Sequence, residues 1–571
     1  MINPINNHSL PSWQQLSLPQ QVAQLLVVRT SGHLFDQELR YPQWEAPAAT
    51  LRHWIQDLGV GGVIFLGGST AELATRIQQM QHWSSVPLLM AADIEQGVGQ
   101  RFSGATWMPP PMALGAVAQF DLPQACAYAK AMGAITAQEA DAVGLNWLLA
   151  PIVDINNNPQ NPAISLRAFG ETPEIVIPLI EAFIQGAQDY PVLTTAKHFP
   201  GHGDTAIDPH MELPVIPHPR SHLEQIELAP FRSAIAAGVD AVMTAHLQVP
   251  ALDPEYPATF SNLILTQLLR QEIGFEGLIV TDALVMQAIT RHYGIYDAPI
   301  MALEAGADVI LMPVDPPGTI QAICDAVEKG RLSQERIQTS LERIWRAKQR
   351  VFNPPLKSEP FQRVSESSHS WLERVCSLQA FDLCDAVLHH TLRVKTPSSQ
   401  TSRLSELSPS LHRSRLTADT SSPATNLILI DNLLQASFLG FHPPAVKIPQ
   451  GWGYRSQWVD SQTPVIDRIT DLQPTLLQLF IQSNPFQKTT GLVQMAERWL
   501  EELQRASKLQ AVILYGSPYV WEQLIPLFSA ELPAVFSYSQ TPAAQAIALE
   551  SLPNLGWATS EMEYSDQRFT T

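Results

Sequence analysis

The segment from Val192 to His210 reads VLTTAKHFPGHGDTAIDPH. It begins with apolar and β-branched residues, which is typical of a buried strand, and its first charged side chain is Lys197. Two glycines and two prolines in the remainder restrict the path of the chain, as expected where polar groups must be aimed. The segment therefore predicts a buried strand that leads into a shaped loop carrying titratable side chains.

Seven further apolar runs resemble this strand, and segments with helical periodicity lie between them. Eight strands that alternate with helices favour a closed barrel over an open sheet. We therefore expect an α/β protein with an N-terminal (β/α)8 TIM barrel over residues 1–355. The strands predicted are Leu25–Arg29, Gly62–Leu66, Leu88–Ala92, Asn146–Ala150, Val192–Ala196, Ala241–Ala245, Leu278–Thr281 and Asp308–Met312.

The helices expected in the barrel have lengths that suit crossover connections between parallel strands. They are Ala71–Trp83, Gln124–Val143, Glu174–Gln188, Leu223–Ala237, Asn262–Glu272, Ile320–Lys329 and Leu341–Phe352. Residues 356–369 follow a segment rich in proline and charge and are predicted to form a linker.

Residues 370–571 are expected to form a C-terminal α/β sandwich domain, because buried strands and helices alternate there as well. Its tract from 395 to 426 is rich in Ser, Thr, Pro and Arg and is predicted to be mobile. The elements expected are helices Trp371–Thr391, Leu492–Ala506, Val520–Phe528 and Pro542–Glu550 and strands Leu427–Ile430, Ala511–Tyr515 and Ala534–Tyr538.

The composition, with 45% hydrophobic and 16% charged residues, is that of a globular protein. A formal charge of -19 disfavours binding to nucleic acid, so a neutral ligand is expected. We find no secretion signal in the first 20 residues, no long apolar run and no basic amphipathic helix, so a cytoplasmic location without membrane attachment is expected.

Reactive groups in a TIM barrel lie at the C-terminal ends of the strands. Here these ends carry Asp93, the pair Lys197 and His198, His246, and Asp282. Charged or titratable groups at four strand ends predict a site. For Asp282 a helix N-cap is the alternative to a functional carboxylate.

Asp208 and His210 lie two residues apart in the loop that follows the fifth strand. At this spacing a carboxylate can hold an imidazole nitrogen and raise its basicity, as a general acid or base requires. For any one of these residues an ordinary surface turn would be the simpler interpretation.

Together these segments resemble glycoside hydrolase family 3, in particular its β-N-acetylglucosaminidase branch, over roughly residues 18–348. The most specific match is the Lys-His-Phe-Pro-Gly-His-Gly run, which is followed by Asp-x-His. The segment 92–97, running on to Arg101, resembles the family's Asp-x-Glu-Gly-Gly segment, and residues 166–170 resemble its Arg-Ser-Phe-Gly segment.

The resemblance implies a retaining enzyme that needs no metal or other cofactor. Asp282 would be the nucleophile, and His210 with Asp208 the acid/base. The residues implied to hold the sugar's hydroxyls are Asp93, Arg101, Arg167, Lys197 and His198. The substrate would be a small amino-sugar glycoside or a muropeptide from cell-wall turnover.

Three residues depart from the family pattern. Gln96 adds bulk where a glycine is usual, Ala283 follows the nucleophile where Asp is common, and Pro209 replaces a serine and stiffens the loop. We therefore expect changes in the fit of the sugar's outer hydroxyls and in turnover.

Three other activities compete with this interpretation. A metal-dependent hydrolase is the first, because His198, His202, Asp204, Asp208 and His210 crowd one loop. No two of them form the helical His-x-x-x-His pair of zinc enzymes, because a Pro-Gly pair lies between His198 and His202. A phosphorylase on the same scaffold is the second. A β-glucosidase is the third, but such enzymes draw their acid from the second domain and lack the Asp-x-His loop.

Overall fold

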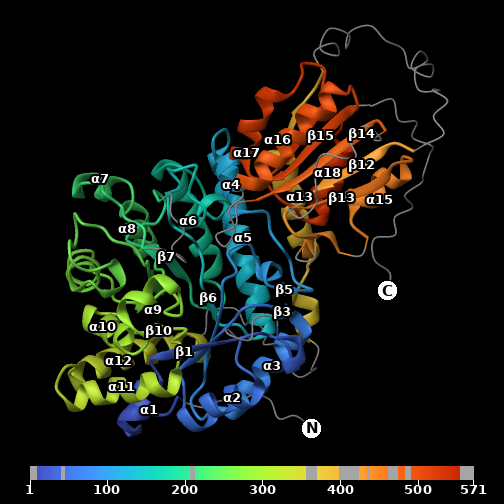
Figure 1. Cartoon of the computed structure of the whole chain (residues 1–571). Helices are drawn as coiled ribbons and strands as arrows, with labels where there is room; N and C mark the ends of the chain where they lie inside the picture. Colours follow the sequence, from blue (N-terminus) through green and yellow to red (C-terminus); the bar gives the residue numbers. More distant parts are fainter. Residues whose placement is uncertain are drawn as a thin grey trace. The chain divides into compact units, whose positions relative to one another are not determined.

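The computed structural model describes residues 10–39, 45–205, 213–354, 370–397, 423–433, 436–440, 442–460, 473–482 and 490–552. The chain divides into two compact units, residues 1–387 with 484–487, and the rest from 388 to 571 (Figure 1). The linker predicted at 356–369 lies outside the described residues.

Eight parallel strands form the centre of the first unit. β10, β1, β2, β4 and β6 pair in that order, and β7, β8 and β9 form a second group. Isolated bridges join Trp147 to Leu193 and Val280 to Val309, so the two groups close into one ring. The predicted TIM barrel is confirmed. The strands are β1 Leu26–Thr30, β2 Gly62–Phe65, β4 Leu89–Ala92, β6 Trp147–Leu148, β7 Thr195–Phe199, β8 Ala241–Thr244, β9 Leu278–Val280 and β10 Ile310–Leu311.

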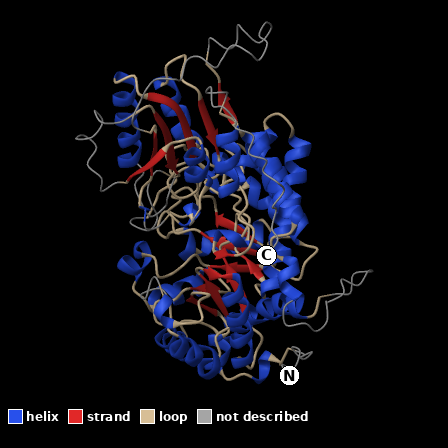
Figure 2. Cartoon of the chain, turned by 90° about the vertical axis from the view of Figure 1, so that its right-hand side faces the viewer, coloured by secondary structure: helices blue, strands red, loops and turns tan. Residues whose placement is uncertain are grey.

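Helices cover the outside of these strands (Figure 2). Several of these helices have a capped N-terminus: Ser69, Asp121 and Ser333 each accept a hydrogen bond from a backbone N–H of the first turn. The helices are α1 Leu18–Ala23, α2 Ala48–Arg52, α3 Thr70–Trp83, α4 Pro111–Ala118, α5 Leu122–Val143, α6 Pro173–Ala187, α7 Arg220–Gln225, α8 Ala229–Ala236, α9 Gln287–Tyr293, α10 Asp297–Ala305, α11 Pro316–Glu328 and α12 Gln334–Phe352.

Shorter and wider helical turns complete this unit. A π-helix at Leu263–Glu272 confirms the helix predicted there but not its type, and a second π-helix spans His53–Leu58. The remaining elements are the two-residue strands β3 Gly68–Ser69 and β5 Phe102–Ser103 and the 3-10 turns Trp13–Gln15, Asp36–Glu38, Val98–Gln100, Ser165–Arg167, Ala258–Phe260 and Ser370–Arg374.

Among the predicted elements, three differ most clearly from the structure. The fifth strand lies three residues later than predicted, so Lys197 and His198 belong to β7 itself. The helix predicted at 223–237 is two helices, α7 and α8, because Pro230 in the first turn of α8 has no N–H to continue α7. The helix predicted at 371–391 is a 3-10 turn followed by α13 Leu378–Thr391, and Cys376 between them has a φ of 52°.

The second unit is a six-stranded sheet flanked by helices, which confirms the predicted α/β sandwich (Figure 2). The sheet order is β11-β16-β15-β14-β12-β13, and β11 pairs antiparallel with β16. The strands are β11 Arg393–Lys395, β12 Thr425–Leu429, β13 Arg455–Val459, β14 Thr475–Ile481, β15 Leu509–Gly516 and β16 Ala534–Ser537. The helices are α15 Pro444–Gly451, α16 Thr490–Arg505, α17 Pro518–Leu524 and α18 Pro542–Glu550, with a 3-10 turn at Ser437–Leu439 and another at Ile525–Leu527.

The prediction that residues 395–426 are mobile is wrong at both ends of this tract, where the chain forms strands. Lys395 belongs to β11, and Thr425 and Asn426 are buried in β12. Residues 398–422 lie outside the described part of the chain.

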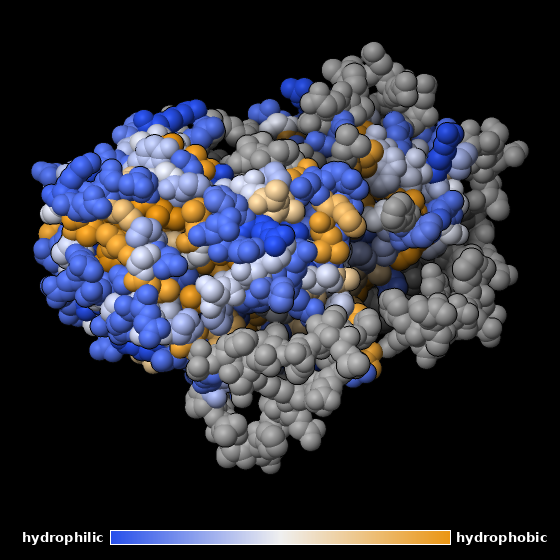
Figure 3. Space-filling view, turned by 90° about the horizontal axis from the view of Figure 1, so that it is seen from below, coloured by the Kyte–Doolittle hydropathy of each residue, from blue (hydrophilic) through white to orange (hydrophobic). Residues whose placement is uncertain are grey.

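No helix among the described residues is both long and apolar enough to cross a membrane. On the face drawn in Figure 3, hydrophilic residues cover most of the described surface, and hydrophobic ones form smaller patches between them. This distribution is expected of amphipathic helices that turn their apolar side to a core.

Candidate active site

The polar residues predicted at the strand ends lie at the C-terminal end of the barrel. Asp93 directly follows β4, His246 lies two residues after β8 and Asp282 two residues after β9, while Lys197 and His198 lie in the second half of β7. Since the strands are parallel, these side chains come from the same end of the ring.

Lys197 is the centre of a cluster of charges. Its side chain is only 1% exposed, and its Nζ lies 2.7 Å from Asp93 Oδ1 and 3.0 Å from Glu95 Oε1. Arg167 Nη2 donates to the same oxygen of Glu95 over 2.6 Å, and Gln100 Nε2 donates to the other oxygen over 3.0 Å. Glu95 thus pairs with both cations, with Lys197 of β7 and with Arg167 of the 3-10 turn at Ser165–Arg167.

Burial would raise the pKa of the Glu95 carboxyl, but the charges of Lys197 and Arg167 hold it well below its usual range. Glu95 is therefore ionised at neutral pH. Asp93 and Arg167 are partly exposed, with side-chain exposures of 28% and 26%. Both therefore have surface to offer to a ligand, whereas Lys197 and Glu95 are enclosed.

Arg101 is exposed, and its Nε donates to the backbone carbonyl of Asp93 over 3.2 Å. Gln96, the residue expected to alter the fit of the sugar, is buried, and its side-chain oxygen accepts a hydrogen bond from Trp107 Nε1 at 3.2 Å. The glycine that follows it is needed: Gly97 has a φ of 81°, and a Cβ there would lie 2.7 Å from the Thr106 carbonyl oxygen.

Asp154, which the sequence analysis did not single out, organises the start of the loop after β7. It is fully buried and accepts hydrogen bonds from the backbone N–H of His198 and of His202, at 3.1 and 2.8 Å. Its Oδ2 also lies 2.8 Å from Nδ1 of the His198 ring. These bonds fix the ring of His198 and leave its Nε2 as the nitrogen directed away from Asp154.

The glycines of this loop are required by close packing. A Cβ at Gly203 would lie 1.5 Å from the carbonyl oxygen of Ile155, and one at Gly201 would lie 2.6 Å from Cβ of Glu227. The inference that the loop has a specified path is therefore confirmed for residues 201–205.

His202 is a buried, neutral imidazole. Burial lowers its pKa to about 4, although the charges of Asp154 and Asp282 act in the opposite direction. Its Nδ1 lies 3.1 Å from Thr205 Oγ1, while its buried Nε2 has no hydrogen-bond partner among the described residues.

Asp282 is half-buried, and its Oδ1 accepts a hydrogen bond from the backbone N–H of Ala283 over 2.7 Å. The next helix, α9, begins at Gln287 and has Met286 at its N-cap, so the interpretation of Asp282 as a helix cap is wrong. His246 lies beside it: its Nε2 is 3.3 Å from the Ala283 carbonyl oxygen, and its Nδ1 is 2.8 Å from Thr259 Oγ1.

Asp208, Pro209 and His210 lie in the segment 206–212, outside the described residues. The chain on either side of this segment is joined by an ion pair, in which Asp204 Oδ2 lies 2.6 Å from His218 Nε2. Two groups of potential metal ligands occur among the described residues, His218 with His222 and Glu227, and His33 with Glu38 and Glu72. Neither includes the loop histidines His198 and His202.

The described part of this site combines two half-buried carboxylates, Asp93 and Asp282, with several donors at the same end of the barrel. Such a set can bind a polyhydroxylated ligand through charge-assisted hydrogen bonds and present a nucleophilic oxygen to it.

The chain matches two family models, "Glycosyl hydrolase family 3 N terminal domain" over residues 17–347 and "Bacterial Glycosyl hydrolase family 3 C-terminal domain" over residues 417–554. It is 35% identical over 334 residues to β-hexosaminidase A of Pseudoalteromonas piscicida, a match that covers 53% of this chain and 55% of that protein. The chain therefore aligns with about half the length of that relative.

Among solved structures, a glycoside hydrolase family 3 β-N-acetylglucosaminidase from Paenibacillus sp. strain FPU-7 superposes with a TM-score of 0.72 and 30% identity, covering 94% of this chain and 96% of that one. A β-glucoside phosphorylase superposes with a TM-score of 0.74 over 94% and 92% of the two chains, but at 20% identity it shows a likeness of fold alone. The first family model spans more than half of the chain, which therefore belongs to glycosyl hydrolase family 3.

Proposed function

We propose that this family 3 protein is a retaining β-N-acetylglucosaminidase that removes terminal β-linked N-acetylhexosamine residues. The observation that carries the proposal is Asp282, a half-buried carboxylate at the C-terminal end of the barrel, at the same end as the charged cluster around Lys197. The names of the relatives above support the choice of an amino sugar.

In the first step, a carboxylate oxygen of Asp282 forms a bond to the anomeric carbon, while the bond from that carbon to the leaving oxygen breaks and His210 gives the leaving oxygen a proton. In the second step, His210 takes a proton from water, and the water oxygen displaces Asp282. Two inversions give net retention of the β configuration. Asp208 is assigned to hold the His210 ring.

The cations assigned to the sugar are Lys197, Arg101 and Arg167, with Asp93 as an acceptor and His198 as a further donor or acceptor. Glu95 is assigned a positioning role, because it holds Lys197 and Arg167 in place from a fully buried position. Preorganised donors of this kind avoid the cost of orienting polar groups during the reaction.

The test of the substrate class is a panel of nitrophenyl β-glycosides. We expect a higher specificity constant for the N-acetylglucosaminide than for the glucoside. A higher value for the glucoside would contradict the assignment. Running the reaction with and without inorganic phosphate separates hydrolysis from phosphorolysis, because only the latter yields a sugar 1-phosphate.

The acid/base assignment is tested with His210→Gly. A nitrophenyl oxide departs with little proton assistance, so the first step on activated substrates should partly survive, while loss of activity on a disaccharide should be larger. Added azide should restore turnover and yield a β-glycosyl azide. Equal losses on both substrates without rescue by azide would move the role to another residue.

The substrate in the cell is proposed to be a small amino-sugar glycoside or muropeptide from peptidoglycan turnover, handled in the cytoplasm.

A further inference from the structure

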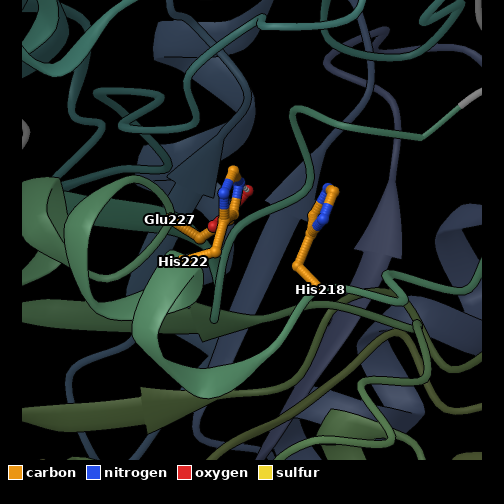
Figure 4. A group of neighbouring side chains, drawn as sticks. All are labelled: His218, His222 and Glu227. Atoms are coloured by element: carbon orange, nitrogen blue, oxygen red, sulfur yellow. Dashed lines mark ion pairs between the residues drawn. The ribbon is translucent and has the colours of Figure 1, made fainter.

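Three potential metal ligands meet beside the loop that precedes α7. His218 lies two residues before α7, His222 lies within it, and Glu227 lies in the turn between α7 and α8 (Figure 4). One ligand atom from each side chain lies within 4.8 Å of the others. The break between the two helices, caused by Pro230, brings Glu227 back towards His222.

Glu227 is buried but poorly satisfied. Its side chain is 4% exposed, and neither carboxylate oxygen accepts a hydrogen bond from another described residue. Nε2 of His222 is also buried without such a bond, and it lies 3.6 Å from Oε1 of Glu227. Two buried, unsatisfied polar groups that face each other across this distance are rare in folded proteins, because each loses its hydrogen bonds to water.

A separation of 3.6 Å is too long for a hydrogen bond, but it suits two ligands of one small cation. Two ligands at about 2.0 to 2.1 Å from a tetrahedral zinc ion lie roughly 3.4 Å apart. Imidazole nitrogen and carboxylate oxygen are both zinc ligands, and two histidines with one glutamate form a known zinc set.

Asp204 lies outside this group of three ligands and orients His218. Its Oδ2 lies 2.6 Å from Nε2 of His218. When that nitrogen carries the proton, Nδ1 has the free lone pair that a metal requires. A carboxylate that holds the far nitrogen of a liganding histidine is a recurrent second layer of zinc sites. The ring centroids of His218 and His222 lie 4.1 Å apart, so the two imidazoles lie side by side.

We propose that His218, His222 and Glu227 bind one zinc-class divalent cation and that Asp204 orients His218 for it. The cation joins His218 to α7 and to the turn that follows α7, and through Asp204 it also joins the described residues that end at 205. Its role is to stabilise the packing of these described segments, and it takes no part in the cleavage of the glycoside.

The other cluster of potential ligands offers a matched control. In the group of His33, Glu38 and Glu72, the carboxylate of Glu72 already accepts hydrogen bonds from Ser69 Oγ and from the backbone N–H of Leu34, at 2.8 and 3.3 Å. A cation there would have to replace bonds that exist. We therefore expect no high-affinity site at His33.

The test is zinc binding to the full-length protein after removal of metal with a chelator. Calorimetric titration with zinc chloride should give one site per chain, and cobalt should give the visible absorption of a tetrahedral ion. His222→Ala, a change at a partly exposed position, should weaken zinc binding by about 100-fold or more, and Asp204→Asn by roughly 10- to 100-fold. His33→Ala should bind zinc as the wild type does.

Thermal unfolding gives a second measurement. Zinc in excess should raise the unfolding temperature of the wild type and of His33→Ala but not that of His222→Ala, because only a site in the folded state couples binding to stability. The proposal is overturned if the wild type takes up no zinc, if His222→Ala binds it as tightly as the wild type, or if binding is instead lost in His33→Ala or His202→Ala.

Discussion

Both ends of the barrel contain buried charges, but the C-terminal end also has carboxylates that are partly exposed to solvent. At the C-terminal end, Lys197, Glu95 and Arg167 are paired with one another, while Asp93 and Asp282 remain partly exposed. At the N-terminal end, Asp308 lies just before β10 and is fully buried. It accepts bonds from the guanidinium groups of Arg270, Arg336 and Arg343, from Ser340 Oγ and from the Ile279 N–H.

Helix α12 supplies most of the partners at the N-terminal end. Arg336, Ser340 and Arg343 of this helix bind Asp308, while Arg350 pairs with Asp240, the residue before β8. Lys348 donates to Gln24, two residues before β1. One helix therefore provides hydrogen-bond donors to polar groups at the amino ends of three strands.

This difference in exposure distinguishes carboxylates with a structural role from carboxylates that can contact a ligand. A carboxylate whose lone pairs are all taken by the protein can only hold elements together, whereas a carboxylate with an exposed oxygen can contact a ligand. In barrels the first kind is expected at the N-terminal face and the second at the C-terminal face. Substitutions at the two ends should therefore change different measured quantities.

The largest effect is expected for Asp282→Asn. The amide cannot form the glycosyl intermediate, so kcat should fall on the order of 10⁴-fold or more. The free energy of unfolding should stay close to that of the wild type, because the hydrogen bond from the Ala283 N–H can be kept by the amide oxygen. Mass spectrometry with a 2-fluoro sugar should label Asp282, and a label on any other residue would contradict the assignment.

Asp308→Asn should show the reverse pattern. Removing one charge leaves three arginines around a buried neutral group, and breaking such a buried pair costs about 3 to 5 kcal/mol of stability. Urea unfolding measures the loss, while KM and kcat of the folded enzyme should be unchanged. Asp297→Asn is the control, because Asp297 forms an exposed pair with Arg331, and it should cost less than about 1 kcal/mol. A large loss of kcat in Asp308→Asn would contradict the prediction that charges at the N-terminal end affect only stability.

Glu95→Gln should lower catalytic efficiency by less than Asp282→Asn does. The amide still fills the space but no longer offers a charged acceptor to Lys197 and Arg167. Because hydrogen bonds to charged groups are worth about 1.5 to 3 kcal/mol, we expect kcat/KM to fall roughly 10- to 100-fold. Glu304→Gln, at an exposed pair with Arg331, should leave kcat/KM unchanged. No change in Glu95→Gln would exclude a positioning role for Glu95.

Much of the barrel could be predicted because its strands are short apolar runs separated by helical periodicity. The charged residues directly after those runs marked the correct end of the barrel. Asp154 has no such signal, because it follows the end of β6 by six residues instead of directly. Glu95 was noted within a motif, but its contact with Lys197 joins segments about 100 residues apart and has no local signal.

Other features were missed for different physical reasons. β13 is an edge strand with mostly half-exposed residues, so its pattern is weak, whereas β14 is a fully buried run that periodicity alone does not distinguish from a helix. The His-x-x-x-His spacing of His218 and His222 is visible in the sequence, but it lies outside the histidine-rich run that follows the fifth strand. Pro230 is a sequence signal for the helix break, but it does not indicate that Glu227 lies near His222.

The smallest effect concerns Lys348 at the N-terminal end. This side chain is fully buried, and burial lowers its pKa to about 7 from 10.5. Between these values the lysine is charged in the unfolded chain and neutral in the folded protein. The unfolded state therefore binds more protons, so the stability that depends on this group rises with pH over this window. A pKa unit corresponds to about 1.4 kcal/mol, so raising the pH from 7 to 8 should add about 1 kcal/mol.

Lys348→Met isolates this contribution, because methionine has a similar length and no charge. Urea unfolding at pH 7 and at pH 8 should show a rise in the wild type that is about 1 kcal/mol larger than in the variant. The matched control is Lys329→Met, since Lys329 is 76% exposed, and it should keep the wild-type dependence on pH. If Lys348→Met kept the full rise, Lys348 would be charged in the folded protein, and its hydrogen bond to Gln24 would be enough to keep a buried ammonium ionised.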